Sequence, residues 1–369
     1  MRFPEFSGEW KEEQLDSIAT LSKGVGISKE QLSEVGEPCI LYGELYTKYK
    51  SEIIKQIESK TDIDCSKLKR SKANDVIIPC SGETAVDIAT ARCVPFDNIL
   101  FGGDLNVISL HKYDGAFMSY QLNGKRKYDI ARVAQGVSVV HLYGDHLKAI
   151  KTYNPTLPEQ QKIAKLLSLL DERIATQNKI IEKLQSLIKG IAQHCIKEST
   201  SGNTYVKLGD ICQITTGKLD ANAQVDNGIY PFFTCAEQPF KIDSFAFDTE
   251  ALLISGNGAN LGYINYYHGK FNAYQRTYVL DIFSENIQYI KWALKVLLPK
   301  RIAIEKSSSN TPYIVLSTLS DLRLPIPNKS IQCHIAKLMQ SLERKLSSQI
   351  ALNGSYNRLK QYLLRQMFI

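Results

Sequence analysis

The longest regular pattern in the chain is a run of apolar residues at alternating steps of four and three over residues 163–195. Such spacing marks the a and d positions of a coiled coil, sustained here over about five heptads. The positions hold Ile163, Leu167, Leu170, Ile174, Gln177, Ile181, Leu184, Ile188, Ile191 and Cys195. The pattern predicts a helix over residues 158–196 that is roughly 58 Å long at about 1.5 Å per residue, and therefore acts as a spacer.

A second run of apolar residues with the same spacing, here called the second seam, extends from residue 335 to residue 367 and is less regular than the first. It predicts a helix over residues 329–368. Asn353 and Lys360 interrupt this seam. Its other positions hold Ile335, Met339, Leu342, Leu346, Gln349, Tyr356, Leu363 and Met367. The pattern predicts a second long helix of similar length.

We expect these two helices to pair antiparallel, because the second must return alongside the first. Gln177 is the polar residue at the midpoint of the first seam, and Gln349 occupies the equivalent position of the second. An antiparallel pair would bring these two amides together, where each can both donate and accept a hydrogen bond. We therefore predict that Gln177 and Gln349 fix the register of the helix pair, unless both side chains point partly to solvent.

Comparing the sequence with itself reveals an internal repeat with an offset of 172 residues. The stretch Ile163-Ala164-Lys165-Leu166-Leu167 recurs as Ile335-Ala336-Lys337-Leu338-Met339. A segment containing proline precedes each copy, at residues 154–158 and 324–327. The chain is therefore predicted to alternate between globular domains and long helices, with these boundaries: domain 1–157, helix segment 158–203, domain 204–327 and helix segment 328–369.

The globular domains carry short apolar runs between clusters of Gly, Asn and Asp. Val76-Ile77-Ile78 and Leu252-Leu253-Ile254 are examples, and β-branched runs of this length are typical of strands. No βαβ rhythm connects the runs, which favours mixed or antiparallel sheets. We therefore predict an α+β protein with two globular mixed α/β domains. Two long antiparallel coiled-coil helices separate these domains, and the internal repeat implies pseudo-twofold symmetry.

Composition describes an ordinary globular chain, with 44% hydrophobic and 22% charged residues. No apolar run approaches the roughly 18 to 20 residues that cross a bilayer, and the first residues do not resemble a signal peptide. The eight cysteines form no C-x-x-C pair, which argues against a zinc site and against a disulfide framework. We therefore expect no metal site, and free thiols in a reducing cytoplasm.

The net charge of +7 is unevenly distributed along the chain. Residues 158–203 carry a net +2 and residues 328–369 a net +6, whereas residues 1–157 and 204–327 carry −1 and 0. An excess of positive charge suits a polyanionic partner. If the charge is considered alone, a solvated helix surface explains this excess of positive charge more simply.

The sequence motifs of self-contained enzymes are absent. The chain has no G-x-x-x-x-G-K-[ST] loop for ATP phosphates, and no Asn/Asp-Pro-Pro-aromatic tetrad of the kind that amino-methyltransferases use on a flipped base. The six histidines pair with no Ser or Cys at a recognisable catalytic spacing. Asp171 and Glu172, on the first long helix, are most simply a solvated face. We therefore predict that the chain carries no catalytic residue and is not an enzyme by itself.

Several stretches of the chain resemble the DNA-specificity subunits of type I restriction–modification systems. These stretches are residues 39–47 (CILYGELYT), 81–84 (SGET), 102–106 (GGDLN), 157–164 (LPEQQKIA), 254–260 (ISGNGAN) and 276–278 (RTY). The resemblance covers essentially the whole chain, because the family also alternates two target-recognition domains with two long helices. The start of the second helix, residues 330–335, departs from the family pattern by lacking the Pro-Glu-Gln lead of residues 158–160.

The resemblance implies a non-catalytic DNA-binding specificity subunit of a type I restriction–modification complex. Each globular domain would recognise one half of a bipartite target in double-stranded DNA. The helices would set the spacer and dock two methylation subunits. The chain itself would bind no cofactor: S-adenosylmethionine, ATP and Mg²⁺ would be used by the methylation and restriction subunits, and no membrane would be involved.

Two other interpretations remain open. One is a self-contained DNA methyltransferase or nuclease, against which the absent motifs count. The other is a purely structural coiled-coil linker, against which the about 280 residues in the globular domains count.

Direct recognition of base edges uses Arg or Lys on guanine and Asn or Gln on adenine. In the first domain a basic cluster and a predicted loop supply candidates: Lys67, Lys69, Arg70, Lys72, Gln121, Asn123, Lys125, Arg126 and Lys127. In the second domain the candidates are Lys218, Asn222, Gln224, Gln238, Asn257, Asn260, Gln275 and Arg276. Solvated surface runs and turn-forming asparagines are the alternatives. The spacing of Tyr42, Tyr46 and Tyr49 favours one helix face packed into the core over DNA contact.

Overall fold

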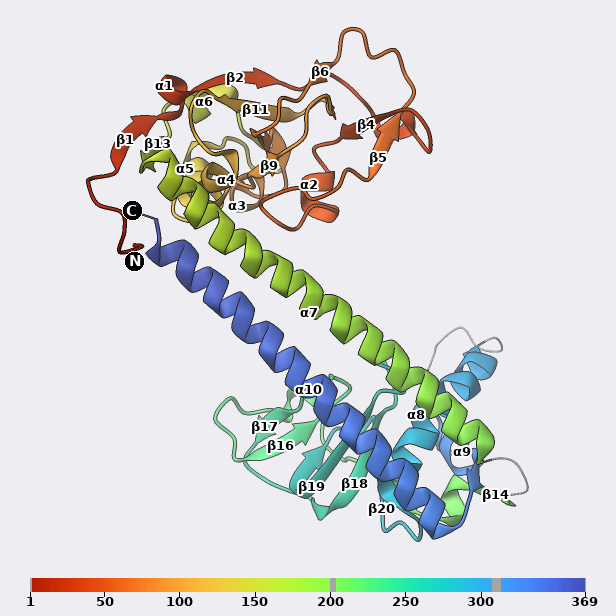
Figure 1. Ribbon diagram of the computed structural model, residues 1–369. Helices are drawn as coiled ribbons and strands as arrows, with labels where there is room; N and C mark the ends of the chain where they lie inside the picture. Colours follow the sequence, from red (N-terminus) through yellow and green to blue (C-terminus); the bar gives the residue numbers. More distant parts are fainter. Residues whose placement is uncertain (1, 200–203, 307–312, 369) are drawn as a thin grey trace. The chain divides into compact units, whose positions relative to one another are not determined.

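The computed structural model describes residues 2–199, 204–306 and 313–368, and the chain divides into two compact units (Figure 1). Unit 1 comprises Met1–Lys179 together with Ala351–Ile369, and unit 2 comprises Ile180–Ile350. The boundaries fall inside the two long helices, so each unit contains one part of each helix. Unit 1 therefore combines the two ends of the chain.

Unit 1 is built on a buried strand, β7 (Asp75–Pro79), which contains the predicted apolar run. Val76 and Ile78 join one apolar cluster and Ile77 joins another, because successive side chains of a strand point to opposite faces. β7 lies in an antiparallel sheet of order β2–β11–β7–β9, beside a mixed sheet of order β3–β5–β4–β10–β6. Their bounds are β2 (Ala19–Lys23), β11 (Leu105–Leu110), β9 (Arg92–Val94), β3 (Leu32–Ser33), β5 (Ser59–Thr61), β4 (Glu37–Ile40), β10 (Leu100–Phe101) and β6 (Lys69–Arg70).

Short helices and two further strand pairs complete unit 1. α4 (Gly115–Asn123) packs against β7 and β9, and buries the large side chains Phe117 and Tyr120. The strand pairs are β1 (Lys11–Gln14) with β13 (Lys151–Asn154), and β8 (Ser81–Gly82) with β12 (Val140–His141). The remaining short helices are α1 (Leu15–Ile18), η1 (Lys29–Gln31), α2 (Glu44–Thr47), α3 (Ala85–Ile88), α5 (Lys127–Val133) and α6 (Gly144–Lys148).

Unit 2 is built on a six-stranded mixed sheet of order β15–β20–β18–β19–β16–β17. Leu252 and Ile254 of β18 (Phe247–Ser255) face one apolar cluster and Leu253 faces another, so this predicted strand also alternates across the sheet. α8 (Ile287–Lys306) packs against β18 and β19. The other elements are β14 (Thr204–Lys207), η2 (Leu208–Asp210), β15 (Gln213–Thr216), η3 (Ala221–Ala223), β16 (Tyr230–Phe233), β17 (Phe240–Ile242), β19 (Ile264–Ala273), β20 (Thr277–Asp281), α9 (Leu316–Ser320) and β21 (Arg323–Ile326).

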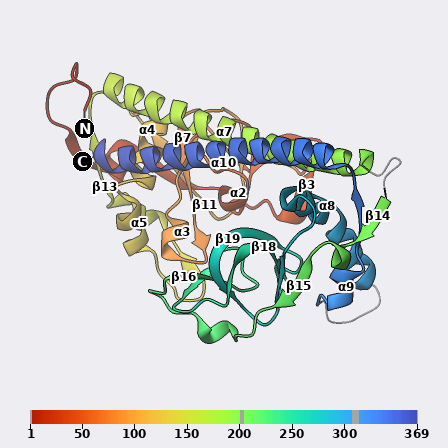
Figure 2. The ribbon, with the colours of Figure 1, turned by 90° about the horizontal axis from the view of Figure 1, so that it is seen from below.

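The two long helices are α7 (Leu157–Glu198) and α10 (Lys329–Gln366), and in each unit they lie side by side (Figures 1 and 2). In unit 1, Ile163 and Leu167 of α7 share an apolar cluster with Leu363 and Met367 of α10. In unit 2 the cluster joins the other end of α7 to the first turns of α10, through Leu184, Ile188, Ile335 and Met339. The start of each helix therefore packs with the end of the other, as the antiparallel prediction requires. The α+β fold class is confirmed.

Polar residues that interrupt the predicted seam make specific contacts in unit 1. Asn353 donates from Nδ2 to Oδ1 of Asn178 over 2.8 Å. Lys360 is an ion-pair partner of Asp171, at 2.7 Å, and of Glu52. The prediction of a solvated face at Asp171 was wrong, because Asp171 is buried, while Glu172 is exposed as expected.

The register prediction at Gln177 and Gln349 involves both units. Gln177 is buried in unit 1, and Gln349 is half-buried in unit 2. Their pairing therefore stays a prediction.

A buried glutamine holds the start of each long helix in the same way. In unit 1, Gln160 donates to the Pro155 carbonyl over 2.8 Å and accepts from the Asp114 backbone N–H over 2.9 Å. In unit 2, Gln332 donates to the Pro327 carbonyl over 2.9 Å and accepts from the backbone N–H of Asn286 over 3.0 Å.

These contacts correct the sequence analysis of the second helix start. The glutamine, the proline and the residue that donates its backbone N–H are each offset by 172 residues between the two units, which is the offset of the sequence repeat. The second helix lacks the Pro-Glu part of the lead but keeps its glutamine, Gln332. The repeat therefore extends to individual hydrogen bonds.

Candidate nucleic-acid interface

Unit 2 brings several of its predicted residues together around Cys235, which follows β16. Asn257 accepts a hydrogen bond from the Cys235 thiol, with Sγ and Oδ1 3.0 Å apart, and Asn260 donates to the Cys235 carbonyl over 2.9 Å. The Cys235 thiol also lies 3.6 Å from the Arg276 carbonyl oxygen. These contacts hold the loops that follow β16 and β18 against the start of β20, and leave the Arg276 side chain exposed.

Two glycines allow the chain to approach itself closely beside this cluster. A Cβ atom on Gly217 would lie 1.9 Å from the carbonyl oxygen of Ala273, and one on Gly256 would lie 2.4 Å from that of Arg276. The segment after Gly217 then runs beside Gln275, whose backbone N–H donates to the Leu219 carbonyl over 2.9 Å. Lys218 and Gln275 are exposed, so this end of the sheet presents cationic and amide groups next to one another.

The other candidates of unit 2 are exposed on neighbouring loops. Asn222 lies in η3, whose first turn is capped by the Asp220 carboxylate, and Gln224 follows it. Gln238 follows the Cys235 loop by three residues. The asparagines flanked by glycine behave differently: the Asn257 and Asn260 side chains are half-buried and hold the loop together. Their contacts therefore favour the alternative that these two asparagines form turns and do not contact DNA.

In unit 1 the basic cluster surrounds β6, which lies at one edge of the five-stranded sheet. Lys67 and Lys72 are exposed, and Lys69 is half-buried. Arg70 forms a two-pronged ion pair with Glu37 of β4, and one of its two hydrogen bonds is 2.9 Å long. The guanidinium lowers the pKa of the Glu37 carboxyl by hydrogen bonding. Arg70 is therefore already paired, and Lys67 and Lys72 are the freer cations of this cluster.

The predicted loop at residues 121–127 is wrong in its extent, because only residues 124–126 form a turn, between the end of α4 and the start of α5. Gln121 is buried, and both its amide atoms bond the backbone of Tyr153, at 2.7 and 2.8 Å. Asn123 does the same to the backbone of Ala91, at 2.8 and 2.7 Å. Both amides therefore have a structural role inside unit 1.

The cations of the same segment differ in exposure. Lys125 is exposed, and Arg126 is half-buried between Asp129, at 3.3 Å, and the ring of Tyr153. Burial lowers the pKa of Lys127. Of the residues predicted in this segment, Lys125 is the one that is exposed.

Residues that sequence reasoning missed include Cys235, which organises the unit 2 cluster. All eight cysteines are free thiols. No group of His, Cys, Asp and Glu residues within the described ranges is arranged to hold a metal ion. None of the helices described is long and apolar enough to cross a membrane.

Comparison with known proteins places this geometry in a family. The family model described as the type I restriction modification DNA specificity domain matches twice, at residues 7–186 and 200–353. The chain is 42% identical to the type I restriction enzyme EcoDI specificity subunit of Escherichia coli over 143 residues, which are 39% of this chain and 32% of that protein. It is 23% identical to the MjaVIII specificity subunit of Methanocaldococcus jannaschii over 73% of this chain and 72% of that protein.

The fold has solved counterparts. The S subunit of a type I restriction–modification system from M. genitalium matches with a TM-score of 0.70 at 20% identity, over 100% of this chain and 99% of that one. The match to the E. coli relative spans only about a third of that protein. Because the family model matches most of the chain in two consecutive copies, the chain belongs to the type I restriction modification DNA specificity family.

Proposed function

We propose that this chain is the sequence-specific DNA-binding subunit of a type I restriction–modification complex, in which each unit recognises one half of a bipartite target. The observation that carries the proposal is the duplication. Two family-model matches coincide with two repeats whose buried glutamines, Gln160 and Gln332, make equivalent hydrogen bonds. Two equivalent recognition domains in one chain suit a target with two halves, as paired half-sites do in other DNA-binding proteins.

The recognition surfaces we propose are the exposed cations and amides at the two sites described, together with the half-buried Lys69. In unit 2 they are Lys218, Asn222, Gln224, Gln238, Gln275 and Arg276. In unit 1 they are Lys67, Lys69, Lys72 and Lys125. Arg and Lys suit guanine edges and phosphates, and Asn and Gln suit adenine edges. The half-buried Asn257 and Asn260 would then position Arg276 and would not touch bases.

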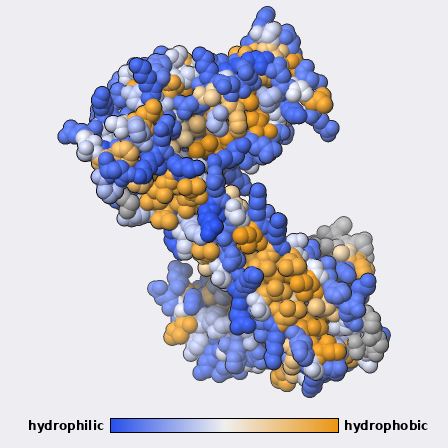
Figure 3. All heavy atoms as spheres, in the orientation of Figure 1, coloured by the Kyte–Doolittle hydropathy of each residue, from blue (hydrophilic) through white to orange (hydrophobic). Residues whose placement is uncertain are grey.

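Exposed apolar residues recur on the long helices at repeat-equivalent positions and support docking of two copies of a partner. In unit 1 they are Leu166, Leu352 and Leu359, with exposed fractions of 37%, 39% and 46%. The equivalents in unit 2 are Leu338, Ile180 and Leu187, at 45%, 43% and 53%. Figure 3 shows an apolar area over α7 and α10 in unit 2. We propose that each unit docks one methylation subunit there.

Catalysis would belong to those partners. The chain would bind no cofactor, and methylation and restriction subunits would use S-adenosylmethionine, ATP and Mg²⁺. The test is a gel-shift assay on double-stranded DNA, with and without a methylation subunit, combined with a methyl-transfer assay. We expect sequence-specific binding by the assembled complex and no methyl transfer by the chain alone. Methyl transfer by the isolated chain would overturn the proposal.

Exchanging residues 204–327 for the equivalent segment of another specificity subunit should change one half of the target only. The reason is that the exchanged segment carries all the recognition residues proposed for unit 2. Mapping N6-methyladenine across the genome of cells that carry the exchanged chain measures both halves together. A change in both half-sites would contradict independent recognition by the two units.

Replacing Leu187 or Leu359 by aspartate should remove one methylation subunit per chain, and the double replacement should remove both. A carboxylate placed in an apolar contact must be desolvated without a partner, so we expect each affinity to fall at least tenfold, or about 1.4 kcal/mol. Native mass spectrometry of the co-expressed complex counts the subunits. Gln185→Asp, an exposed change on the same helix as Leu187, is the matched control. Equal loss in the control would mean that the apolar positions are not the docking site.

A further inference from the structure

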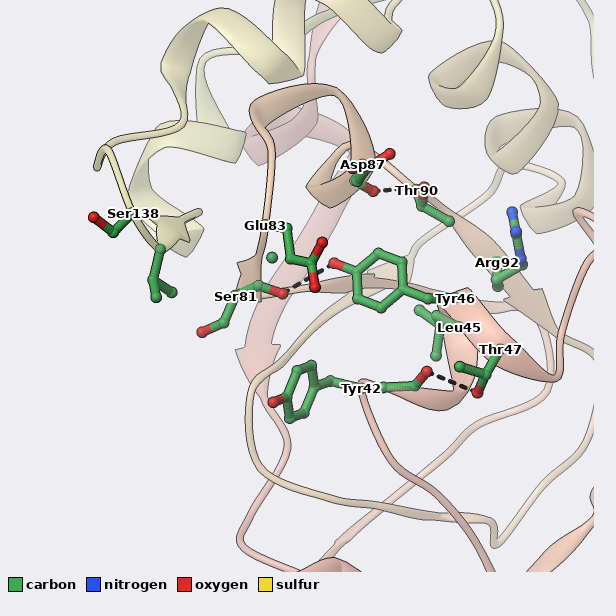
Figure 4. Close-up of a pocket in the computed structure, with 13 residues that line it drawn as sticks. Tyr42, Leu45, Tyr46, Thr47, Ser81, Glu83, Asp87, Thr90, Arg92 and Ser138 are labelled. Carbon is green, nitrogen blue, oxygen red and sulfur yellow. Dashed lines mark hydrogen bonds between the residues drawn. The ribbon is translucent and has the colours of Figure 1, made fainter. Parts of the chain in front are cut away.

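A cavity in unit 1 is lined by two of the stretches that resemble the specificity-subunit pattern. It has a volume of about 690 Å³ and lies between α2, the β8–α3 segment and the loop before β12 (Figure 4). Residues 42–47 contribute Tyr42 and Tyr46, and residues 81–84 contribute Ser81 and Glu83. Neither stretch carries a residue proposed above to bind DNA. The cavity is therefore a feature that the proposed function does not use.

The two tyrosines do not form the core face that their spacing favoured. Tyr49 is buried as expected, but the side chains of Tyr42 and Tyr46 are 40% and 36% exposed and line the cavity. The Tyr46 hydroxyl donates to the Ser81 carbonyl over 2.9 Å. A Cβ atom on Gly82 would lie 3.0 Å from that hydroxyl, so the glycine leaves room for the ring. Two aromatic rings thus line the cavity from α2 and the turn before it.

Two acidic residues of the β8–α3 segment, Glu83 and Asp87, line the same cavity. Thr84 caps α3 and donates from Oγ1 to the Asp87 carboxylate over 2.6 Å, which holds that side chain in place. Glu83 is exposed, and Figure 4 shows its carboxylate directed toward Tyr46. Burial, together with the negative charge of Asp87, raises the pKa of Tyr46. The lining of the cavity therefore combines two acidic residues with two aromatic rings.

Lys127 of α5 interacts electrostatically with Asp87, whereas the guanidinium of Arg92 is bonded to the backbone. Arg92 lines the cavity, but its guanidinium donates to the carbonyls of Tyr49, at 2.8 Å, and Ala91, at 3.0 Å. Figure 4 shows its side chain pointing away from Glu83. The apolar residue Val139 also lines the cavity, with an exposed fraction of 53%. Acidic groups at an opening with exposed apolar neighbours are typical of a contact with a cationic protein segment.

We propose that this cavity binds an arginine side chain of a protein partner. The planar guanidinium would lie against the face of Tyr42 and donate hydrogen bonds to Glu83. Arginine is favoured over lysine because its flat cation both stacks on aromatic rings and pairs with a carboxylate through two donors. The inference rests on the proposed function, because the partner would be another subunit of the same complex.

DNA is the less suitable occupant. Glu83 and Asp87 would repel the phosphate backbone, and the cations of unit 1 proposed above to bind DNA lie on other segments, around β6 and at Lys125. A single nucleobase would fit the volume and could stack on a tyrosine, so the experiment includes a nucleobase as a second probe.

The test titrates N-acetylarginine amide into the full chain and follows binding by saturation-transfer NMR. N-acetylcitrulline amide is the matched control, because it has nearly the same shape and no charge. We expect saturable binding of the arginine probe and at least fivefold weaker binding of the citrulline probe. Equal binding of the two probes, or no binding of either, would overturn the proposal. Preferential binding of 9-ethyladenine would assign the cavity to a nucleobase instead.

Variants locate the site. Glu83→Gln combined with Asp87→Asn should weaken binding of the arginine probe at least fivefold, whereas Glu58→Gln with Asp62→Asn, two exposed acids elsewhere in unit 1, should not. Unchanged binding in the first variant would refute the assignment. If that variant does not fold, the comparison of the arginine and citrulline probes on the unmodified chain still tests the proposal. Gel shifts of the unmodified complex test the proposed function separately: if they fail while the arginine probe binds, the proposed function alone is lost.

Discussion

Replacing Lys360 by alanine is expected to lower the free energy of unfolding of unit 1 by about 3–5 kcal/mol, because two buried carboxylates would lose their cation. Lys360 contacts Glu52 and Asp171, both of which are buried, and Asp171 also accepts from the Tyr120 hydroxyl over 2.6 Å. Urea denaturation, monitored by hydrogen exchange in unit 1, measures the loss. Arg365→Ala removes an exposed cation one to two turns further along α10 and should change little.

The loss at Lys360 should also depend on pH. Burial raises the pKa of Glu52 above its ordinary value of 4.5, despite the opposing effect of Lys360. A carboxyl with a raised pKa in the folded state contributes stability at low pH that is lost as pH rises through the folded value. Without Lys360 this pKa should rise further, so the variant should lose less stability at pH 5 than at pH 8. A loss that is equal at both values would contradict the assignment of the effect to buried carboxylates.

Replacing Gln332 by leucine is expected to lower the stability of unit 2 by about 2–4 kcal/mol, and Gln160→Leu should do the same to unit 1. Each change removes the partners of a buried proline carbonyl and of a backbone N–H, and each group left without a partner costs about 1–3 kcal/mol. The exposed fractions of Gln160 and Gln332 are 1% and 0%, so water does not replace the lost bonds.

Hydrogen exchange resolved by residue reports the two units separately. The matched control is Gln161→Leu, next to Gln160 but exposed. Because the two glutamines are repeat-equivalent, their two losses should be similar. A loss at Gln160 without one at Gln332 would mean that the second helix start is held by other contacts.

The long helices were predictable from the sequence because their pattern is local. The steps of four and three that begin at Ile163 require only neighbouring turns of one helix, and the structure gives α7 as 42 residues against the 39 predicted. The seam interruption at Lys360 had no local explanation. Its partners, Glu52 and Asp171, are far away in the sequence, and spacing carries no information about such contacts.

The candidate interface was predictable only in part, for the same reason. Residue type identified Arg276 and Lys218 as suitable DNA contacts, and both are exposed. The same reasoning selected Gln121, whose amide instead holds the backbone of Tyr153. Residue type alone does not distinguish a glutamine that contacts DNA bases from one that forms hydrogen bonds to the protein backbone. Cys235 was missed because its role depends on two loops that meet only in the fold.

Unit 1 is built from two segments that are far apart in the sequence, and this affects how it can fold during synthesis on the ribosome. This unit requires the segment Ala351–Ile369, which is translated after the whole of unit 2. Until Lys360 emerges, Glu52 and Asp171 lack their cation, and Ile163 and Leu167 lack the side chains of α10 that cover them. Domains of many proteins fold in the order in which they are translated. Here unit 2 can finish folding first, while the residues of unit 1 that precede it wait for α10.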